Sequence, residues 1–133
     1  MNETYVLIFI IATTLVAALF INRFHLPKAY LNRKCMGKEW LNAFPNSSKA
    51  EIRNFLCVFS ESFMFKTKDQ LKFEPNDKLY EIYRAVYPSQ HSPDAMELET
   101  FATLLYKQYN FKLESIWSEN ITLGEVFAEI KNA

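Results

Sequence analysis

A long apolar stretch near the N-terminus constrains this chain more than any other feature. The stretch "YVLIFIIATTLVAALFI", Tyr5 to Ile21, is apolar except for Thr13 and Thr14 and contains no charged residue. A helix that rises about 1.5 Å per residue over this stretch would nearly cross a hydrocarbon core of about 30 Å. The sequence therefore predicts an N-terminal single transmembrane helix as an anchor over residues 1–22.

Two alternatives compete with a membrane anchor for this stretch. A signal peptide would have a basic leader and small residues at its cleavage site. Here the leader "MNETY" contains Glu3 and no Lys or Arg, and bulky Phe20 and Ile21 stand where cleavage would need small residues. A buried core helix is disfavoured, because little of the 133-residue chain is left to cover it. A retained anchor is the favoured interpretation.

Basic residues gather directly after the apolar stretch, in a juxtamembrane segment at 23–46. Those that precede its first acid are Arg23, Lys28, Arg33, Lys34 and Lys38. By the positive-inside rule, they predict a single-pass protein with its N-terminus outside and its C-terminal domain in the cytoplasm. They would also lie close to anionic headgroups, so membrane lipid is an expected partner. A segment packed on the C-terminal domain is an equal alternative.

The charge of the chain is unevenly distributed, although 15 Lys plus Arg balance 15 Asp plus Glu. Beyond Lys38 the acids outnumber the bases, and such a domain would repel phosphates, so nucleic acid is not an expected partner. Cys35 and Cys57 lack a metal-binding spacing, and no P-loop or H-E-x-x-H motif occurs. Neither a metal nor a cofactor is expected.

The remaining segment, 47–133, predicts an all-α domain. Apolar residues recur there at helical spacing, and no alternating strand pattern of useful length is present. We therefore expect a four-helix bundle around a core rich in phenylalanine, of which the chain has 12. The segments expected to be helical are 47–66, 77–88, 92–109 and 122–132.

Capping signals mark the starts of these helices. Ser48 and Glu51, like Thr122 and Glu125, have the spacing of a capping box, in which a hydroxyl and a carboxylate each pair with a backbone N–H. The helix at 77–88 is expected to be capped by Asp77 or by the asparagine before it.

The order of three segments suggests a family. These are the first helix "SSKAEIRNFLCVFSESFMF", the acidic helix start "DAMELETF" and the closing "NITLGEVFAEI". Together they resemble the acyl carrier proteins, and most of all the divergent acyl-carrier-like proteins of enterobacteria. The resemblance covers about Ser47 to Ala133 and implies an acyl-carrier-like four-helix domain. It also implies that the membrane in question is the bacterial inner membrane.

Ala95 departs from that family at its most important position. The family has Asp-Ser-Leu or Asp-Ser-Met at the start of its second helix, and the serine carries phosphopantetheine. Here Ala95 lies between Asp94 and Met96, and a methyl group offers no oxygen to form the phosphodiester. The chain is therefore expected to carry no phosphopantetheine.

The acids around Ala95 are the predicted partner-binding residues. Asp94, Glu97 and Glu99, with Met96, resemble the recognition helix by which carriers dock onto basic patches of enzymes. The alternative is an ordinary solvated face whose acids lie at the positive end of the helix dipole.

The predicted function is that of a non-catalytic adaptor, anchored at the membrane, which binds a basic-patch enzyme or a membrane complex. Ser92, His91 and Asp94 lie close in sequence, but adjacency in a turn is poor evidence for a triad, so no enzyme is predicted. One alternative is acyl-chain or lipid binding, and another is a toxin-immunity or secretion-system accessory protein.

Overall fold

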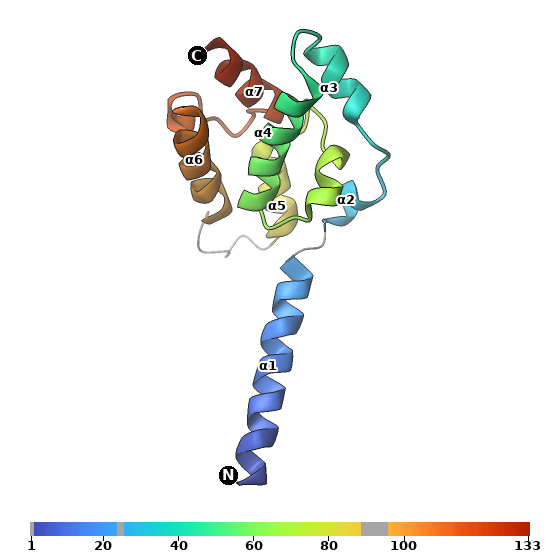
Figure 1. Cartoon of the computed structure of the whole chain (residues 1–133), viewed down its shortest axis with the longest axis vertical. Coiled ribbons are helices and arrows are strands. Elements are labelled where there is room, and N and C mark those ends of the chain that lie inside the picture. The colour runs from blue at the N-terminus through green and yellow to red at the C-terminus, as the bar shows by residue number, and fades with distance from the viewer. Residues whose placement is uncertain (1, 24–25, 89–95) are drawn as a thin grey trace.

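The computed structural model describes residues 2–23, 26–88 and 96–133, apart from the side chains of 18–23 (Figure 1). Within these ranges the regular elements are helices, as the sequence predicts. Their bounds are α1 (Glu3–Arg23), α2 (Lys28–Leu31), α3 (Gly37–Ala43), α4 (Lys49–Ser62), η1 (Thr67–Lys72), α5 (Leu79–Val86), α6 (Met96–Tyr109), η2 (Leu113–Ser115) and α7 (Leu123–Asn132). An isolated antiparallel bridge joins Lys78 to Thr122.

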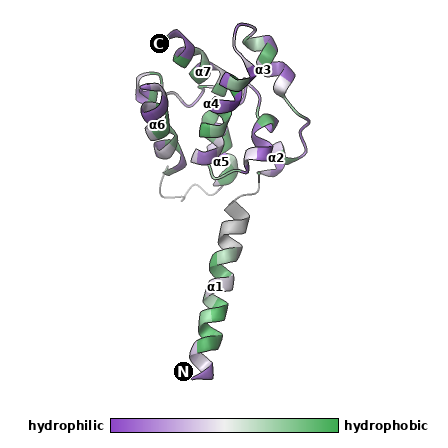
Figure 2. Ribbon diagram, viewed as in Figure 1, coloured by the Kyte–Doolittle hydropathy of each residue, from purple (hydrophilic) through white to green (hydrophobic). Residues whose placement is uncertain are grey.

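Helix α1 stands apart from the other helices, and its described side chains, which are exposed, are mostly apolar from Tyr5 onward (Figures 1 and 2). No helix in the described part of the chain combines the length and the apolar character needed to cross a membrane.

This finding corrects the sequence-based expectation for the N-terminus. The predicted transmembrane helix at 1–22 is wrong, and so is the combined fold class of a transmembrane anchor plus a helical bundle. The single-pass inner-membrane location, with an outside N-terminus and a cytoplasmic domain, is wrong for the same reason.

Helix α4 lies at the centre of the remaining fold, between α6 on one side and η1 on the other (Figure 1). Phe55 and Phe59 of α4 are fully buried. The ring of Phe59 lies 5.6 Å from Phe101 of α6 and 5.0 Å from Phe73, which follows η1. Such edge-on aromatic pairs contribute about 0.5–1.5 kcal/mol each beyond the area they bury. The predicted core rich in phenylalanine is present.

The segment from Leu26 to Phe44 packs on this core, which is one of the two alternatives that the sequence left open. Trp40 of α3 is fully buried, and its indole Nε1 donates to the carbonyl oxygen of Phe73 at 2.8 Å. The backbone N–H of Met36 donates to the oxygen of Leu71 at 2.7 Å. A fully buried indole with a satisfied N–H makes this segment an integral part of the domain.

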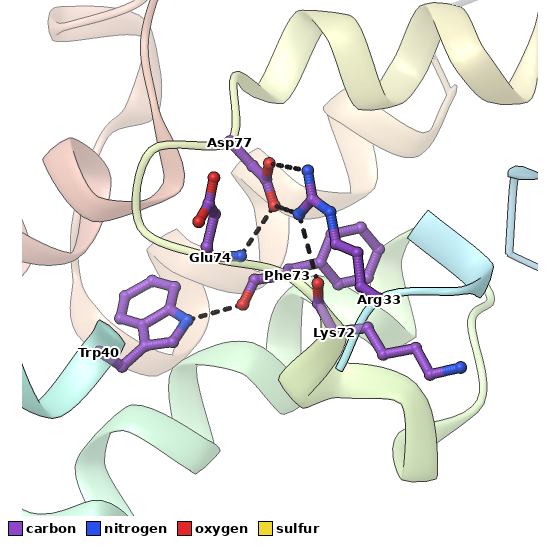
Figure 3. Close-up of polar contacts among 6 residues, drawn as sticks. All are labelled: Arg33, Trp40, Lys72, Phe73, Glu74 and Asp77. Carbon is purple, nitrogen blue, oxygen red and sulfur yellow. Dashed lines mark hydrogen bonds and ion pairs between the residues drawn. The ribbon is translucent and has the colours of Figure 1, made fainter. Parts of the chain in front are cut away.

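Arg33, predicted to face the membrane, instead binds Asp77 (Figure 3). Its two terminal nitrogens donate to the two carboxylate oxygens at 2.6 and 2.9 Å. One of these nitrogens also donates to the carbonyl oxygen of Lys72 at 3.3 Å, and the guanidinium lies 4.7 Å from the ring centroid of Tyr30. The structure leaves Lys28, Lys34 and Lys38 exposed.

The helix caps agree with the sequence in part. Thr122 and Glu125 form the complete predicted capping box of α7, with bonds of 3.1 and 3.3 Å. At α4 the Ser48 hydroxyl accepts from the Glu51 N–H at 3.1 Å, which is half of such a box. The predicted side-chain cap of α5 is wrong, because the carboxylate of Asp77 is occupied by Arg33 and by the Glu74 N–H, at 2.8 Å.

The start of α7 fits tightly against the loop that leads into α5. The Gly124 N–H donates to the backbone carbonyl oxygen of Pro75 at 2.8 Å, and the Leu123 N–H donates to the backbone carbonyl oxygen of Asp77 at 2.9 Å. A Cβ added to Gly124 would lie 2.9 Å from both the Cβ and the oxygen of Pro75. The glycine of the "TLG" segment is therefore required for close backbone approach.

Candidate docking groove beside helix α6

An open groove lies beside α6, where one flank of this helix meets η2. It consists of two adjoining hollows of about 270 and 460 Å³ that share Glu99, Ala102 and Glu114. The other residues that line them are Leu98, Thr103, Tyr106, Lys112, Leu113 and Trp117. We call this surface the α6 groove.

The packing of α6 determines which side chains reach the groove. Phe101 and Leu105 are fully buried against the core. Ala102 follows Phe101 by about 100° around the helix, so it lies at the edge of the buried face, together with Leu98. Both are half-buried and pack on the core cluster from outside. The groove floor is therefore an extension of the apolar core to the surface.

The side of the groove formed by η2 adds a large exposed aromatic ring. Leu113 is buried, whereas Trp117 is 39% exposed. Exposed indole rings are enriched at protein interfaces, because they combine a large apolar area with a polar N–H.

The charged residues of the groove are mainly acidic. Glu99 on α6 and Glu114 on η2 are both exposed, and neither forms an ion pair with another residue in the described ranges. Lys112 is the one base among the lining residues. The groove thus has an apolar floor and two unpaired carboxylates beside it.

The predicted partner-binding residues have different positions in this region. Asp94 and Ala95 lie outside the described residues. Met96 begins α6 and is 54% exposed, and Glu99 is exposed and lines the groove. Glu97 is only 6% exposed, so its carboxylate does not lie on the solvated face that the sequence suggested.

Glu97 faces inward, where a tyrosine hydroxyl forms a hydrogen bond with its carboxylate. The hydroxyl of Tyr87, directly after α5, donates to Oε1 of Glu97. The other carboxylate oxygen, Oε2, is buried and has no hydrogen-bond partner in the described part of the chain. Glu97 is thus placed to connect α6 to the end of α5, whereas Glu99 faces the groove.

Sequence reasoning did not identify Glu114 and Trp117 as groove residues. Both lie in an irregular segment, so helical periodicity gives no indication of the face they occupy. An acid and a tryptophan in the short motif "LESIW" were the available signal.

Cys57, on α4, is not an activated thiol. Burial raises the pKa of the Cys57 thiol, and the nearby Glu61 carboxylate raises it further. A raised pKa keeps the thiol protonated, and the thiol form is a poor nucleophile. No cluster of at least three His, Cys, Asp or Glu side chains that would hold a metal ion is found among the described residues.

Comparison with known proteins gives no relative for this chain. No protein-family model matches it, and no match is found among curated proteins or among solved structures.

Proposed function

We propose that this chain is a non-catalytic binding module that docks a protein partner at the α6 groove. The observation that carries the proposal is an apolar floor, formed by Leu98 and Ala102, between two unpaired acids. A partner that fits would insert one apolar or aromatic anchor and place basic side chains next to Glu99 and Glu114. Buried anchors with a charged surround are typical of binding hot spots.

The acids would act mainly on the rate and specificity of docking. Exposed carboxylates attract a basic partner over roughly a Debye length, about 8 Å at physiological salt. The apolar floor and Trp117 would supply most of the affinity, since exposed charge pairs contribute only about 0–1 kcal/mol.

The order of the elements supports an acyl-carrier-like arrangement as part of this proposal. A first helix, α4, is followed through a long connection by the acidic helix α6 and then by α7, which starts at the capped "TLG" segment. In such an arrangement α6 corresponds to the helix that partners of carriers recognise. Ala95 removes the oxygen nucleophile for phosphopantetheine, so docking would remain without a carried group.

Photo-crosslinking from defined positions tests this proposal. A photoreactive amino acid at Thr103, in the groove, is compared with one at Glu129, an exposed position on α7. We expect a discrete adduct from position 103 only, and the partner so identified is then purified for binding measurements. The same adducts from both positions would contradict a docking surface at α6.

Charge reversal provides the second part of the test. The double variant Glu99→Lys/Glu114→Lys is expected to bind the purified partner about tenfold more weakly at low salt, mainly through a slower association rate. Glu119→Lys/Glu129→Lys changes the net charge equally at exposed positions that do not line the groove and serves as the matched control. Equal losses in the two variants would indicate a general charge effect and overturn the proposal.

Acyl-chain binding is a second candidate for the same groove. It is favoured by the lining of the 270 Å³ hollow, in which Leu98, Leu113 and Trp117 provide apolar surface. Native mass spectrometry of the purified protein tests it: a bound fatty species lost in Ala102→Glu supports the candidate, and a mass equal to that of the chain alone contradicts it.

A further inference from the structure

A second hollow lies on the other side of α4 from α6, and its lining combines apolar side chains with two cations. It has a volume of about 190 Å³ and lies between α3, the start of α4 and η1. Its apolar lining comes from Leu41, Ile52 and Leu71, and Lys49 and Arg53 provide the charge. Cys35 and Gly37 complete the lining. In Figure 1, α3 and α6 lie to the right and left of α4.

The positions of the two cations do not stabilise the folded chain by themselves. Lys49 is the first residue of α4, at the positive end of the helix macrodipole, where a cation typically costs about 0.3–1 kcal/mol. Arg53 follows four residues later on the same face, and like charges at this spacing repel each other. Positive potential is thus concentrated at the hollow.

Neither cation is neutralised by the described side chains. Lys49 and Arg53 form no ion pair with any residue in the ranges 2–17, 26–88 and 96–133. Glu51, in the same turn, points to another face and binds Lys131 instead. Glu39 of α3 lies about 200° around that helix from Gly37, away from the hollow.

The apolar side chains lie deeper than the cations. Ile52 is only 3% exposed, and Leu41 and Leu71 are half-buried, whereas Lys49 and Arg53 are exposed. A ligand that matches an apolar interior with cations at the opening has an apolar tail and one anionic head. A cavity of about 150 Å³ holds a benzene molecule, so the tail is limited to a ring or a short chain.

From this combination we infer that the hollow between α3, α4 and η1 is a binding site for a small amphipathic carboxylate. The carboxylate pairs with Lys49 and Arg53, and a short aliphatic or single-ring tail contacts Ile52, Leu41 and Leu71. Charge-assisted pairing of this kind is stronger than neutral hydrogen bonding, and Arg can bind a carboxylate with two parallel bonds. The site is independent of the α6 groove.

The thiol of Cys35 gives a direct readout, because it is exposed and lines the hollow. In the full chain with Cys57→Ala, Cys35 is the remaining cysteine of the two. Its alkylation by iodoacetamide, a neutral reagent, is followed by intact mass with and without octanoate. We expect octanoate to slow alkylation saturably, and the same concentrations of octylamine, which is cationic at neutral pH, to leave the rate unchanged.

Charge variants decide whether the protection arises at this site. Lys49→Gln/Arg53→Gln is expected to weaken octanoate binding by about tenfold or more, the loss of one or two charge-assisted contacts. Lys66→Gln/Lys107→Gln removes the same charge at exposed positions that line neither this hollow nor the α6 groove, and it is expected to retain full protection. Methyl NMR shifts of Ile52 that saturate with octanoate provide an independent measurement.

The stability of the same variants separates binding from folding. Removal of the cation at the start of α4 is expected to keep or raise the melting temperature of the ligand-free protein, since the helix dipole disfavours it. Equal protection by octylamine, no protection at millimolar octanoate, or unchanged binding in Lys49→Gln/Arg53→Gln would each overturn the inference.

Discussion

Arg33 and Asp77, which are 44 residues apart in sequence, form a two-pronged ion pair that joins the N-terminal segment to the loop before α5. The carboxylate of Asp77 is also the acceptor of the Glu74 N–H, at 2.8 Å (Figure 3). One carboxylate thus fixes both the shape of its own loop and the position of a distant segment. A planar guanidinium is required for the paired contact, which a lysine ammonium cannot reproduce.

Asp77→Asn is expected to lower the free energy of unfolding by about 2 kcal/mol. Loss of one partner from a fully buried pair costs about 3–5 kcal/mol, and we reduce this value because the Arg33 side chain is 27% exposed. Urea unfolding measures the change. Arg33→Lys should give a smaller loss, and a double-mutant cycle should show coupling between residues 33 and 77. Additive effects of the two substitutions would contradict the role given to this pair.

Gly124→Ala is expected to destabilise the fold by about 1–3 kcal/mol, the usual range for overpacking. The new methyl group would lie 2.9 Å from the carbonyl oxygen of Pro75. The backbone would have to move to relieve this overlap. The matched control is Gly37→Ala, whose methyl group would lie at an ordinary 3.5 Å from Sγ of Cys35. Thermal unfolding should show a lower melting temperature for the first variant only. Equal melting temperatures would show that α7 can shift freely.

Alkaline pH is expected to destabilise the protein through Tyr30. Burial, followed by the nearby Asp77 carboxylate, raises the pKa of Tyr30 to about 12 from an unfolded value near 10. The folded state therefore holds the phenolic proton more tightly. Its contribution to stability is full below pH 10 and is lost as the pH rises from about 10 to 12.

The variant Tyr30→Phe isolates this effect from other groups that titrate at high pH. The difference between a pKa of about 12 in the folded state and one near 10 in the unfolded state corresponds to on the order of 2 kcal/mol. The unfolding free energy of the wild type, relative to that of Tyr30→Phe, should therefore fall between pH 9 and pH 11.5. A difference that stays constant over this range would rule out a raised pKa for Tyr30.

Trp40→Phe is expected to destabilise the domain by about 1–3 kcal/mol, because it leaves the Phe73 carbonyl without its indole donor in a buried site. Trp117→Phe, at a 39% exposed position, should change stability little. Acrylamide quenching distinguishes the two rings: fluorescence should be protected when Trp40 alone remains and accessible when Trp117 alone remains. Equal quenching in both variants would contradict the packing of α3 on the core.

Much of the helical pattern could be predicted because it is local. The apolar residues of α4 recur every three or four positions, and the face that they form, with Phe55 and Phe59, is the buried one. The capping box of Thr122 and Glu125 depends on residues only three positions apart. Local spacing therefore sufficed for these features.

The groove and the position of the basic segment could not be predicted in the same way. Glu97 and Glu99 look equivalent in sequence, but a hydroxyl from Tyr87 takes up the first and leaves the second at the groove. Arg33 looks like one of several similar cations until Asp77 is placed beside it. These outcomes depend on contacts between segments that periodicity does not connect.

The sequence by itself determined the all-α character of the chain, the start of α7 and the buried face of α4, because helix formation and capping depend on neighbours within about one turn. The tertiary structure decided that the segment from Leu26 to Phe44 belongs to the core, that Gly124 must lack a side chain, and which acids face the α6 groove. Each of these depends on how distant residues share space, and close packing permits few such arrangements.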